Sequence, residues 1–282
     1  MTYQPFLPEV VGGHIDGRHI VVDHHTHLKH TEVVRGSVVK VEHARNTAVV
    51  RGHDGGEFEV PYQDIVMTAG ATTRTFPIPG LAEQGIGLKT VEEAVALRNQ
   101  ILERLDAASL MTDGDERRRA LTFVVVGGGF AGVEAIAEME GLIRDAVERD
   151  PRISQTEVRI VMVEAMGRIM PEVSEDQAEK VVEHLRGRGI EVLLNTSLGS
   201  AEDGQMQLIN MADKSEAERF GADTLVWTAG VAANAVAKST DFPVEERGRI
   251  EVTPTLQIKD GQDGVLELSL IHISEPTRPR LI

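Results

Sequence analysis

The chain has 282 residues, with 45 acidic against 29 basic side chains and a formal charge of -16. This surplus of negative charge argues against direct binding to nucleic acid or to an anionic membrane surface. The absence of cysteine excludes a disulfide, a thiolate metal site and dithiol chemistry. No apolar run reaches the roughly 18 residues of a membrane-spanning helix, so a cytoplasmic location is expected.

Histidines gather near the start of the chain, in the run VVDHHTHLKH. The pair His25 and His27 could ligate a metal at a strand end, and D-x-H-T-H loosely resembles metal-dependent amidohydrolases. Such a site needs further ligands on later strands, and beyond His53 the only histidines are His184 and His272. We therefore expect a polar, partly exposed helix start here, and no metal site.

Two alternating runs between Thr31 and Val50 predict strands joined by a turn at Ala44–Thr47, and GGEFEVPYQ predicts a further strand of the same sheet. The segment Asp64–Gly70, DIVMTAG, is predicted as a short buried strand. A similar pattern, DTLVWTAG, recurs at Asp223–Gly230. Two such segments suggest two related nucleotide-binding modules.

Thr90–Ala108 is predicted as a helix, because Thr90 and Glu93 form a capping box and apolar residues follow on one face. The next stretch, Met111–Arg119, is polar and charged. We expect it to be a linker.

The stretch LTFVVVGGGFAGVE, from Leu121 to Glu134, passes from an apolar, β-branched run into the pattern G-x-G-x-x-G. Gly127 permits a tight turn, Gly129 lets the backbone approach a pyrophosphate, and Gly132 lets the next helix pack on the strand. The phosphates would lie at the N-terminus of that helix. This pattern predicts a dinucleotide-binding turn.

A second strand, Arg159–Val163, ends at Glu164. An acidic residue at this place in a dinucleotide fold accepts hydrogen bonds from the adenine ribose and favours NAD(H) over NADP(H). The separation from Gly132 exceeds the usual ~20 residues because the intervening helix, ending near Arg149, is longer. An ordinary strand-end carboxylate is the alternative.

The rest of this module is also predicted to alternate helices and strands. Ser174 and Gln177 form a second capping box, and strands are predicted at Glu191–Asn195, Gln205–Met211 and Thr224–Trp227. Trp227 is expected in the core. The fold class is therefore α/β, with a Rossmann-like module between Leu121 and Gly230.

Together, YQPFLPEVVGG, IVMTAGATT with FPIPG, VVVGGGFAGVE, IVMVEAMGRIMP and LVWTAGVAAN closely resemble the type II, non-proton-pumping NADH dehydrogenases. These are flavoproteins with two dinucleotide-binding domains. The resemblance implies that hydride passes from NADH to FAD and that electrons then leave to a membrane quinone. It also implies a peripheral location on the cytoplasmic face of the membrane, and a homodimer is compatible with it.

The resemblance implies a role for each residue that matches a motif. NADH is expected at the turn Gly127, Gly128, Gly129, Phe130 and Gly132, at Glu164, and beside Ala229 and Gly230. FAD is expected at Ala69 and Gly70, with its adenine against the backbone around Val38, and Pro5–Pro8 is expected near the flavin.

Glu134 follows the glycine turn. In related enzymes an acidic residue here lies close to the nicotinamide, so Glu134 is the candidate catalytic residue. The alternative is a carboxylate that merely interacts with the helix dipole, worth about 0.3–1 kcal/mol. No nucleophile is needed, because the flavin supplies the redox chemistry.

The resemblance divides the chain into a partial FAD-binding domain (1–115), an NAD(H)-binding domain (120–235) inserted in it, and a return to the FAD-binding domain (236–268). The family's first glycine-rich turn, its later Gly-Asp segment and its C-terminal membrane-docking region are not found. Residues 269–282 look like a translated sequencing adapter and are expected to be non-native. We expect a fragment that binds FAD poorly and is inactive by itself.

Two other functions fit part of the pattern. One is another FAD- and NAD(P)-dependent reductase of the same superfamily, such as a ferredoxin reductase. The other is a non-catalytic NAD(H)-binding protein. The lack of cysteine disfavours the thioredoxin reductases, and the segment YQPFLPEV favours the NADH dehydrogenases over the glutathione-reductase branch of that superfamily.

Overall fold

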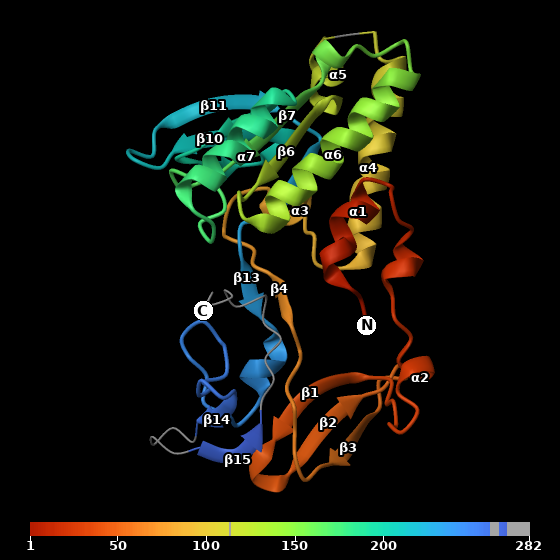
Figure 1. Cartoon of the computed structure of the whole chain (residues 1–282), viewed down its shortest axis with the longest axis vertical. Helices are drawn as coiled ribbons and strands as arrows, with labels where there is room; N and C mark the ends of the chain where they lie inside the picture. The colour runs from red at the N-terminus through yellow and green to blue at the C-terminus, as the bar shows by residue number, and fades with distance from the viewer. Residues whose placement is uncertain (113, 260–264, 270–282) are drawn as a thin grey trace. The chain divides into compact units, whose positions relative to one another are not determined.

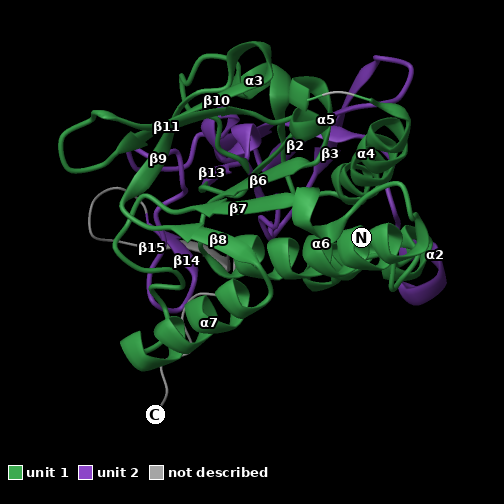
Figure 2. Ribbon diagram, turned by 90° about the horizontal axis from the view of Figure 1, so that it is seen from above, with its two compact units in different colours: residues 1–23, 73–230 green, residues 24–72, 231–282 purple. Residues whose placement is uncertain are grey.

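The computed structural model describes residues 1–112, 114–259 and 265–269, the last of these for the backbone only. The chain forms two compact units, which are coloured separately in Figure 2. Unit 1 consists of residues 1–23 and 73–230, and unit 2 of residues 24–72 and the described residues from 231 onward.

A five-stranded parallel sheet organises unit 1, in the order β5-β12-β6-β7-β8. Every residue of β6 is buried. An unbroken apolar run such as TFVVV is typical of a parallel strand that is covered on both faces. The predicted Rossmann-like α/β module is therefore confirmed. The strands are β5 (Gly85–Ile86), β6 (Thr122–Val126), β7 (Arg159–Val163), β8 (Ile190–Leu193) and β12 (Thr224–Trp227).

Helices pack on one face of this sheet and a second sheet packs on the other (Figure 1). On the helical face, Phe123 and Met162 join a core with α1 (Leu7–Val11), α4 (Val91–Leu110), α6 (Phe130–Arg149) and α7 (Glu175–Gly187). On the opposite face, Val124 and Trp227 pack with an antiparallel sheet and with α3 (Leu81–Gln84). That sheet consists of β9 (Thr196–Ser200), β10 (Gln205–Asn210) and β11 (Glu216–Gly221).

Both predicted capping boxes are present, at Thr90 with Glu93 and at Ser174 with Gln177. Each box fixes the start of its helix, because the N-cap side chain accepts the N–H of the residue three positions on, and that residue's side chain accepts the N-cap N–H. The prediction of a linker at Met111–Arg119 is wrong. Its second half is helical, α5 (Gly114–Ala120), and Asp115 and Glu116 lie favourably in the first turn with the arginines in the last.

The predicted hairpin sheet is confirmed in unit 2, where β1 (Ser37–Glu42), β2 (Thr47–Arg51) and β3 (Glu57–Pro61) form an antiparallel sheet. The predicted turn is a short 3-10 helix that ends at Asn46 in the left-handed conformation. The histidine run is an exposed helix, α2 (His24–His27), as expected. Two smaller sheets pair β4 (Ala71–Thr73) with β13 (Val231–Ala233), and β14 (Gln257–Lys259) with β15 (Val265–Ser269).

The prediction of a buried strand at Asp64–Gly70 is wrong. No strand is formed, Met67 is its one buried residue, and Val66 is 52% exposed. Among the described residues no strand pairs with this segment. Met67 packs in the core of unit 2, but an apolar run forms a strand only when a neighbouring strand also supplies backbone hydrogen bonds, and no described strand does so here.

The compact units follow contacts and do not coincide with the domain boundaries expected from the resemblance. Residues 1–23 and 73–115 pack with the glycine-turn module, because α1 and α4 join the core that α6 belongs to. The expected adapter-like tail lies outside the described residues, apart from Ser269 at the end of β15. Within the described part of the chain, no helix is long and apolar enough to cross a membrane.

Candidate nucleotide-binding site

The glycine turn leaves β6 at Gly127, whose φ of +114° is open only to glycine. Its N–H donates to Val163 O at 2.9 Å, which ties the end of β6 to β7. A Cβ at this position would lie 2.7 Å from Thr228 Oγ1. Both the backbone conformation and the packing therefore require glycine at position 127.

Two further glycines are required by close packing. A Cβ on Gly132 would lie 1.9 Å from Gly127 O, so this residue lets α6 press against the turn. A Cβ on Gly128 would lie 2.7 Å from Ile169 Cγ2. These contacts confirm the helix-packing role that the sequence predicts for Gly132.

Gly129 differs from the other three glycines of the turn, because a Cβ there would meet no protein atom within 4 Å. Its φ and ψ, -73° and 178°, are those of extended backbone that any residue adopts. It is the N-cap of α6, and no side chain caps this helix. The first N–H groups of α6 are therefore left without helical partners and favour an anion. Phe130, beside it, is 45% exposed.

Glu164 is 7% exposed and lies at the end of β7. Its Oε2 accepts the Gly128 N–H at 2.6 Å, and its Oε1 accepts the Met166 N–H at 2.7 Å. The carboxylate thus holds the glycine turn against the loop after β7, a structural role that the sequence did not indicate. A carboxylate has about four acceptor sites, so it retains capacity for ribose hydroxyls.

The segment Thr228–Ala229–Gly230 follows β12 on the other side of β6. Thr228 Oγ1 donates its single proton toward Val126 O at 3.0 Å and Gly127 O at 3.1 Å. Gly230 is exposed and has a φ of +117°. The chain proceeds from β6 to β7 on one side, with β12 on the other. This is the topological switch point at which open α/β sheets bind ligands.

The sequence-predicted NADH residues are therefore brought together at one edge of the parallel sheet. This edge carries Gly127–Gly132, Glu164, Ala229 and Gly230. Trp227, at the end of β12, is confirmed as a core residue, and its Nε1–H donates to Arg74 O at 2.8 Å. Thr228 was missed as a functional position, although the recurring T-A-G contains it.

Glu134 lies one turn into α6, beyond the glycine turn. Partial burial of its carboxyl, followed by the nearby charge of Glu9, raises the pKa of Glu134 above its ordinary value. A carboxyl group with a raised pKa keeps its proton to higher pH, so it can act in proton transfer closer to neutral pH. Glu9 lies in α1, far away in the sequence, and no sequence pattern linked the two residues.

Of the residues expected around FAD, Val38, Ala69 and Gly70 lie in unit 2, whereas Pro5–Pro8 lies in unit 1. Ala69 O accepts a hydrogen bond from Asn234 Nδ2 at 3.1 Å. Gly70 has a φ of +68°, and a Cβ there would meet nothing within 4 Å. Val38 is 45% exposed in β1, next to a bulge that interrupts the pairing with β2.

A groove of about 560 Å³ lies beside this bulge in unit 2. Val38 itself does not line it, but Val39 does. The groove carries both signs of charge, with Lys40, Glu42, Arg45, Lys238 and Asp241 among its lining residues.

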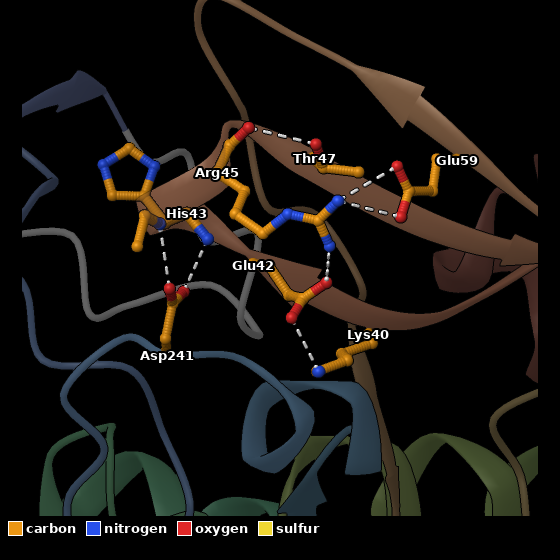
Figure 3. Close-up of polar contacts among 8 residues, drawn as sticks. Lys40, Glu42, His43, Arg45, Thr47, Glu59 and Asp241 are labelled. Atoms are coloured by element: carbon orange, nitrogen blue, oxygen red, sulfur yellow. Dashed lines mark hydrogen bonds and ion pairs between the residues drawn. The ribbon is translucent and has the colours of Figure 1, made fainter.

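Polar contacts organise the wall of this groove (Figure 3). Asp241 accepts the backbone N–H groups of His43 at 2.7 Å and Ala44 at 2.9 Å, which fixes the turn between β1 and β2. Burial opposes ionisation of Asp241, but these donors outweigh it and lower the pKa of the carboxyl. Arg45 bridges Glu42 at 3.0 Å and Glu59 at 3.2 Å. Asp241 could not be identified from the sequence, because its partners lie about 200 residues away.

The described residues contain no group of three or more histidine, aspartate or glutamate side chains that could hold a metal ion. His25 and His27 lie on the exposed helix α2.

The chain is similar to several known proteins. The family model for pyridine nucleotide-disulphide oxidoreductases matches residues 1–265. Two curated proteins of Mycobacterium tuberculosis are similar over 91% of this chain and 56% of their own length. The type II NADH:quinone oxidoreductase NdhA is 30% identical, and the type II NADH:quinone oxidoreductase Ndh is 27% identical.

Among solved structures, NDH2 of Plasmodium falciparum in complex with NADH matches with a TM-score of 0.86 and 20% identity. The match covers 96% of this chain and 56% of that chain. At this identity the likeness supports the fold. The chain spans slightly more than half the length of the curated relatives it matches.

Proposed function

Because the chain belongs to the pyridine nucleotide-disulphide oxidoreductase family, we propose that unit 1 binds NADH at the carboxyl edge of its parallel sheet. The observation that carries this proposal is Gly129. Packing requires glycine at positions 127, 128 and 132, whereas the space in front of Gly129 holds no protein atom. A ligand that approaches the backbone closely explains a glycine there.

Different residues at this edge would bind different parts of NADH. The free N–H groups at the start of α6 would bind the pyrophosphate. Glu164, already fixed by two backbone donors, would accept the adenine ribose hydroxyls. Ala229 and Gly230 would lie beside the same ligand, and Glu134 would lie near the nicotinamide and exchange a proton.

We further propose that the whole protein is an FAD-dependent NADH:quinone oxidoreductase. Support comes from the two mycobacterial relatives, whose names state NADH:quinone oxidoreductase activity. Ala69, Gly70 and the backbone around Val38 would hold FAD, and the open space at Gly70 fits a closely approaching ligand. When bound, FAD would accept hydride from NADH and pass electrons to a membrane quinone.

A peripheral position on the cytoplasmic face of the membrane, and pairing of two copies, belong to the same proposal. Both rest on the likeness to the family.

The test is a calorimetric titration of the purified chain with NADH, comparing it with Gly129→Val. Extended φ and ψ suit valine, so the variant should remain folded, although valine is a poorer N-cap than glycine and its unfolding temperature is measured beside that of the parent. Its dissociation constant should rise by tenfold or more, which corresponds to about 1.4 kcal/mol. Gly187→Ala is the control, because a Cβ there also meets nothing within 4 Å and lies at the far end of α7. Equal affinity for the parent and Gly129→Val, or no affinity in the parent, would refute the proposal.

A further inference from the structure

An arginine without a carboxylate partner lies beside the proposed NADH site. Arg74 follows β4 in the chain and belongs to unit 1. Its backbone N–H donates to Gly230 O at 3.2 Å, and its carbonyl oxygen accepts the Trp227 Nε1–H at 2.8 Å. These two hydrogen bonds fix the Arg74 backbone against the end of β12 and the turn that follows it.

An aromatic pair supports the Arg74 side chain. Its guanidinium carbon, Cζ, lies 4.6 Å from the centroid of the Phe76 ring. The Phe76 ring meets the buried Trp227 ring at an interplanar angle of 62°, with 5.8 Å between the centroids. A stacked guanidinium uses its flat face, so the N–H groups at its edge stay available for an anion. Arg74 is exposed, and within the described part of the chain its guanidinium makes no ion pair or hydrogen bond.

A second arginine follows the parallel strands at this edge, and its donors are already used. Arg168 lies in the loop after β7, and its Nη2 donates to Pro171 O and Val173 O, both at 2.7 Å. The turns directly after β6 and β12 contain no lysine or arginine. Of these two arginines, Arg74 is therefore the one with donors free for a ligand.

The turn after β12 joins Arg74 to the glycine turn. Gly230, which anchors Arg74, donates its N–H to Thr228 O at 2.8 Å. Thr228 Oγ1 in turn donates toward the first carbonyl of the glycine turn at 3.1 Å. Glu164 lies on the other side of β6, at the end of β7. A dinucleotide that crosses the sheet edge from Glu164 over the glycine turn would therefore approach Arg74.

We infer that Arg74 is a nucleotide-binding residue whose guanidinium binds the diphosphate of NADH from the β12 side, and that Phe76 positions it. This inference rests on the proposed NADH site. The N-terminus of α6 supplies roughly half an elementary charge, which is less than a diphosphate carries. An arginine adds a full charge and a forked pair of donors that matches phosphate oxygens.

Calorimetric titration of the full chain tests this with two ligands, NADH and ADP-ribose, which keeps the diphosphate and lacks the nicotinamide. Arg74→Met keeps an apolar stem on Phe76 and removes the guanidinium. Both dissociation constants should then rise about tenfold, because charged hydrogen bonds are lost. Arg74→Lys should recover part of the affinity, because it restores the charge without the fork.

Arg152→Met is the matched control. Arg152 is also exposed, and it lies in the loop before β7, at the opposite edge of the parallel sheet. This variant changes the net charge by the same amount, and it should leave both dissociation constants unchanged. A loss equal to that of Arg74→Met would show that only the overall charge matters, and would overturn the inference.

Phe76→Leu tests the positioning role of the ring. It should weaken both ligands by less than Arg74→Met does. In the double variant it should add no further loss, because the ring acts through the guanidinium. Additive losses would overturn the positioning role of Phe76.

The outcomes separate this inference from the proposed site. Thermal unfolding of each variant is followed by circular dichroism, so that loss of binding is distinguished from loss of fold. Unchanged affinity in Arg74→Met would refute the role of Arg74 alone, and a loss confined to NADH would overturn its assignment to the diphosphate. A parent chain that binds neither ligand would refute the NADH site and this inference with it.

Discussion

Asp64–Gly70 and Asp223–Gly230 share an acidic residue, an apolar run and the tripeptide T-A-G, yet the structure treats them differently. The second contains β12, whose four residues are all buried between β5 and β6. The first forms no strand, and Val66 within it is 52% exposed. Nearly the same local pattern thus accompanies two different structures.

Neighbouring strands therefore decide whether such a pattern becomes a strand. Leu225 pairs with Val124 of β6 and with Gly85 of β5, so neighbouring strands lie on both sides of its backbone. Its side chain is buried in the core. No described strand pairs with Asp64–Gly70. The intrinsic preference of an apolar run is small, and packing against neighbours supplies most of the stability of a strand.

The largest effect should come from truncating one side chain in each segment. Leu225→Ala should lower the free energy of unfolding by about 2–5 kcal/mol, because Leu225 is 1% exposed and a cavity would remain. Val66→Ala should change it by at most about 0.5 kcal/mol. Denaturant unfolding followed by circular dichroism measures both, and equal losses would show that the two segments are packed alike.

The next effect concerns the glycine turn that packs beside Thr228. Gly132→Ala should destabilise the chain by about 1–3 kcal/mol, because its Cβ would overlap Gly127 O and force the turn to shift. Gly187→Ala meets no such obstacle and should be neutral or stabilising by up to about 1 kcal/mol. The same unfolding experiment applies. A neutral Gly132→Ala would show that the strand and helix do not approach as closely as described.

A smaller effect should follow from removing the indole donor at the end of β12. Trp227→Phe keeps an aromatic ring but leaves Arg74 O without its donor, which should cost about 0.5–1.5 kcal/mol. Met67 stands at the matching place in Asp64–Gly70 and carries no such donor. Thermal unfolding by circular dichroism measures the change, since the variant lacks the only tryptophan. A loss above that of Leu225→Ala would reverse the ranking of the two contacts.

The smallest effect belongs to an exposed ion pair of unit 1. Arg117 and then the Ser154 N–H lower the pKa of Glu157 to about 2, from 4.5. The folded state holds this proton less tightly, so the pair stabilises above pH 4.5 and its contribution is lost as pH falls toward 2. Solvent screening keeps the effect below about 1 kcal/mol.

Glu157→Gln should therefore weaken the chain slightly at pH 7 and flatten the decline of stability below pH 4.5. Parallel curves of stability against pH for the parent and Glu157→Gln would show that the ion pair does not contribute to the pH dependence of stability. Such a result would leave the comparison of the two T-A-G segments intact.

Several features could be predicted from the sequence because their causes are local. The capping boxes at Thr90 and Ser174 need residues three positions apart, and the glycine turn needs fixed spacing after an apolar strand. Relations between distant residues could not be predicted. Burial, followed by the charge of Glu9 from another helix, raises the pKa of Glu134, and Asp241 fixes a turn about 200 residues away. The irregular conformation of Asp64–Gly70 likewise depends on the strands that could pair with it, and local sequence does not show them.

NADH binding at the carboxyl edge of the parallel sheet is tested by a map of backbone amide shifts in the nitrogen-15-labelled chain during titration with NADH. We expect the largest shifts on Gly127–Phe130, on Glu164 and Met166, and on Ala229 and Gly230. Saturating NADH that leaves these amides unmoved, or moves only residues of unit 2, would contradict it.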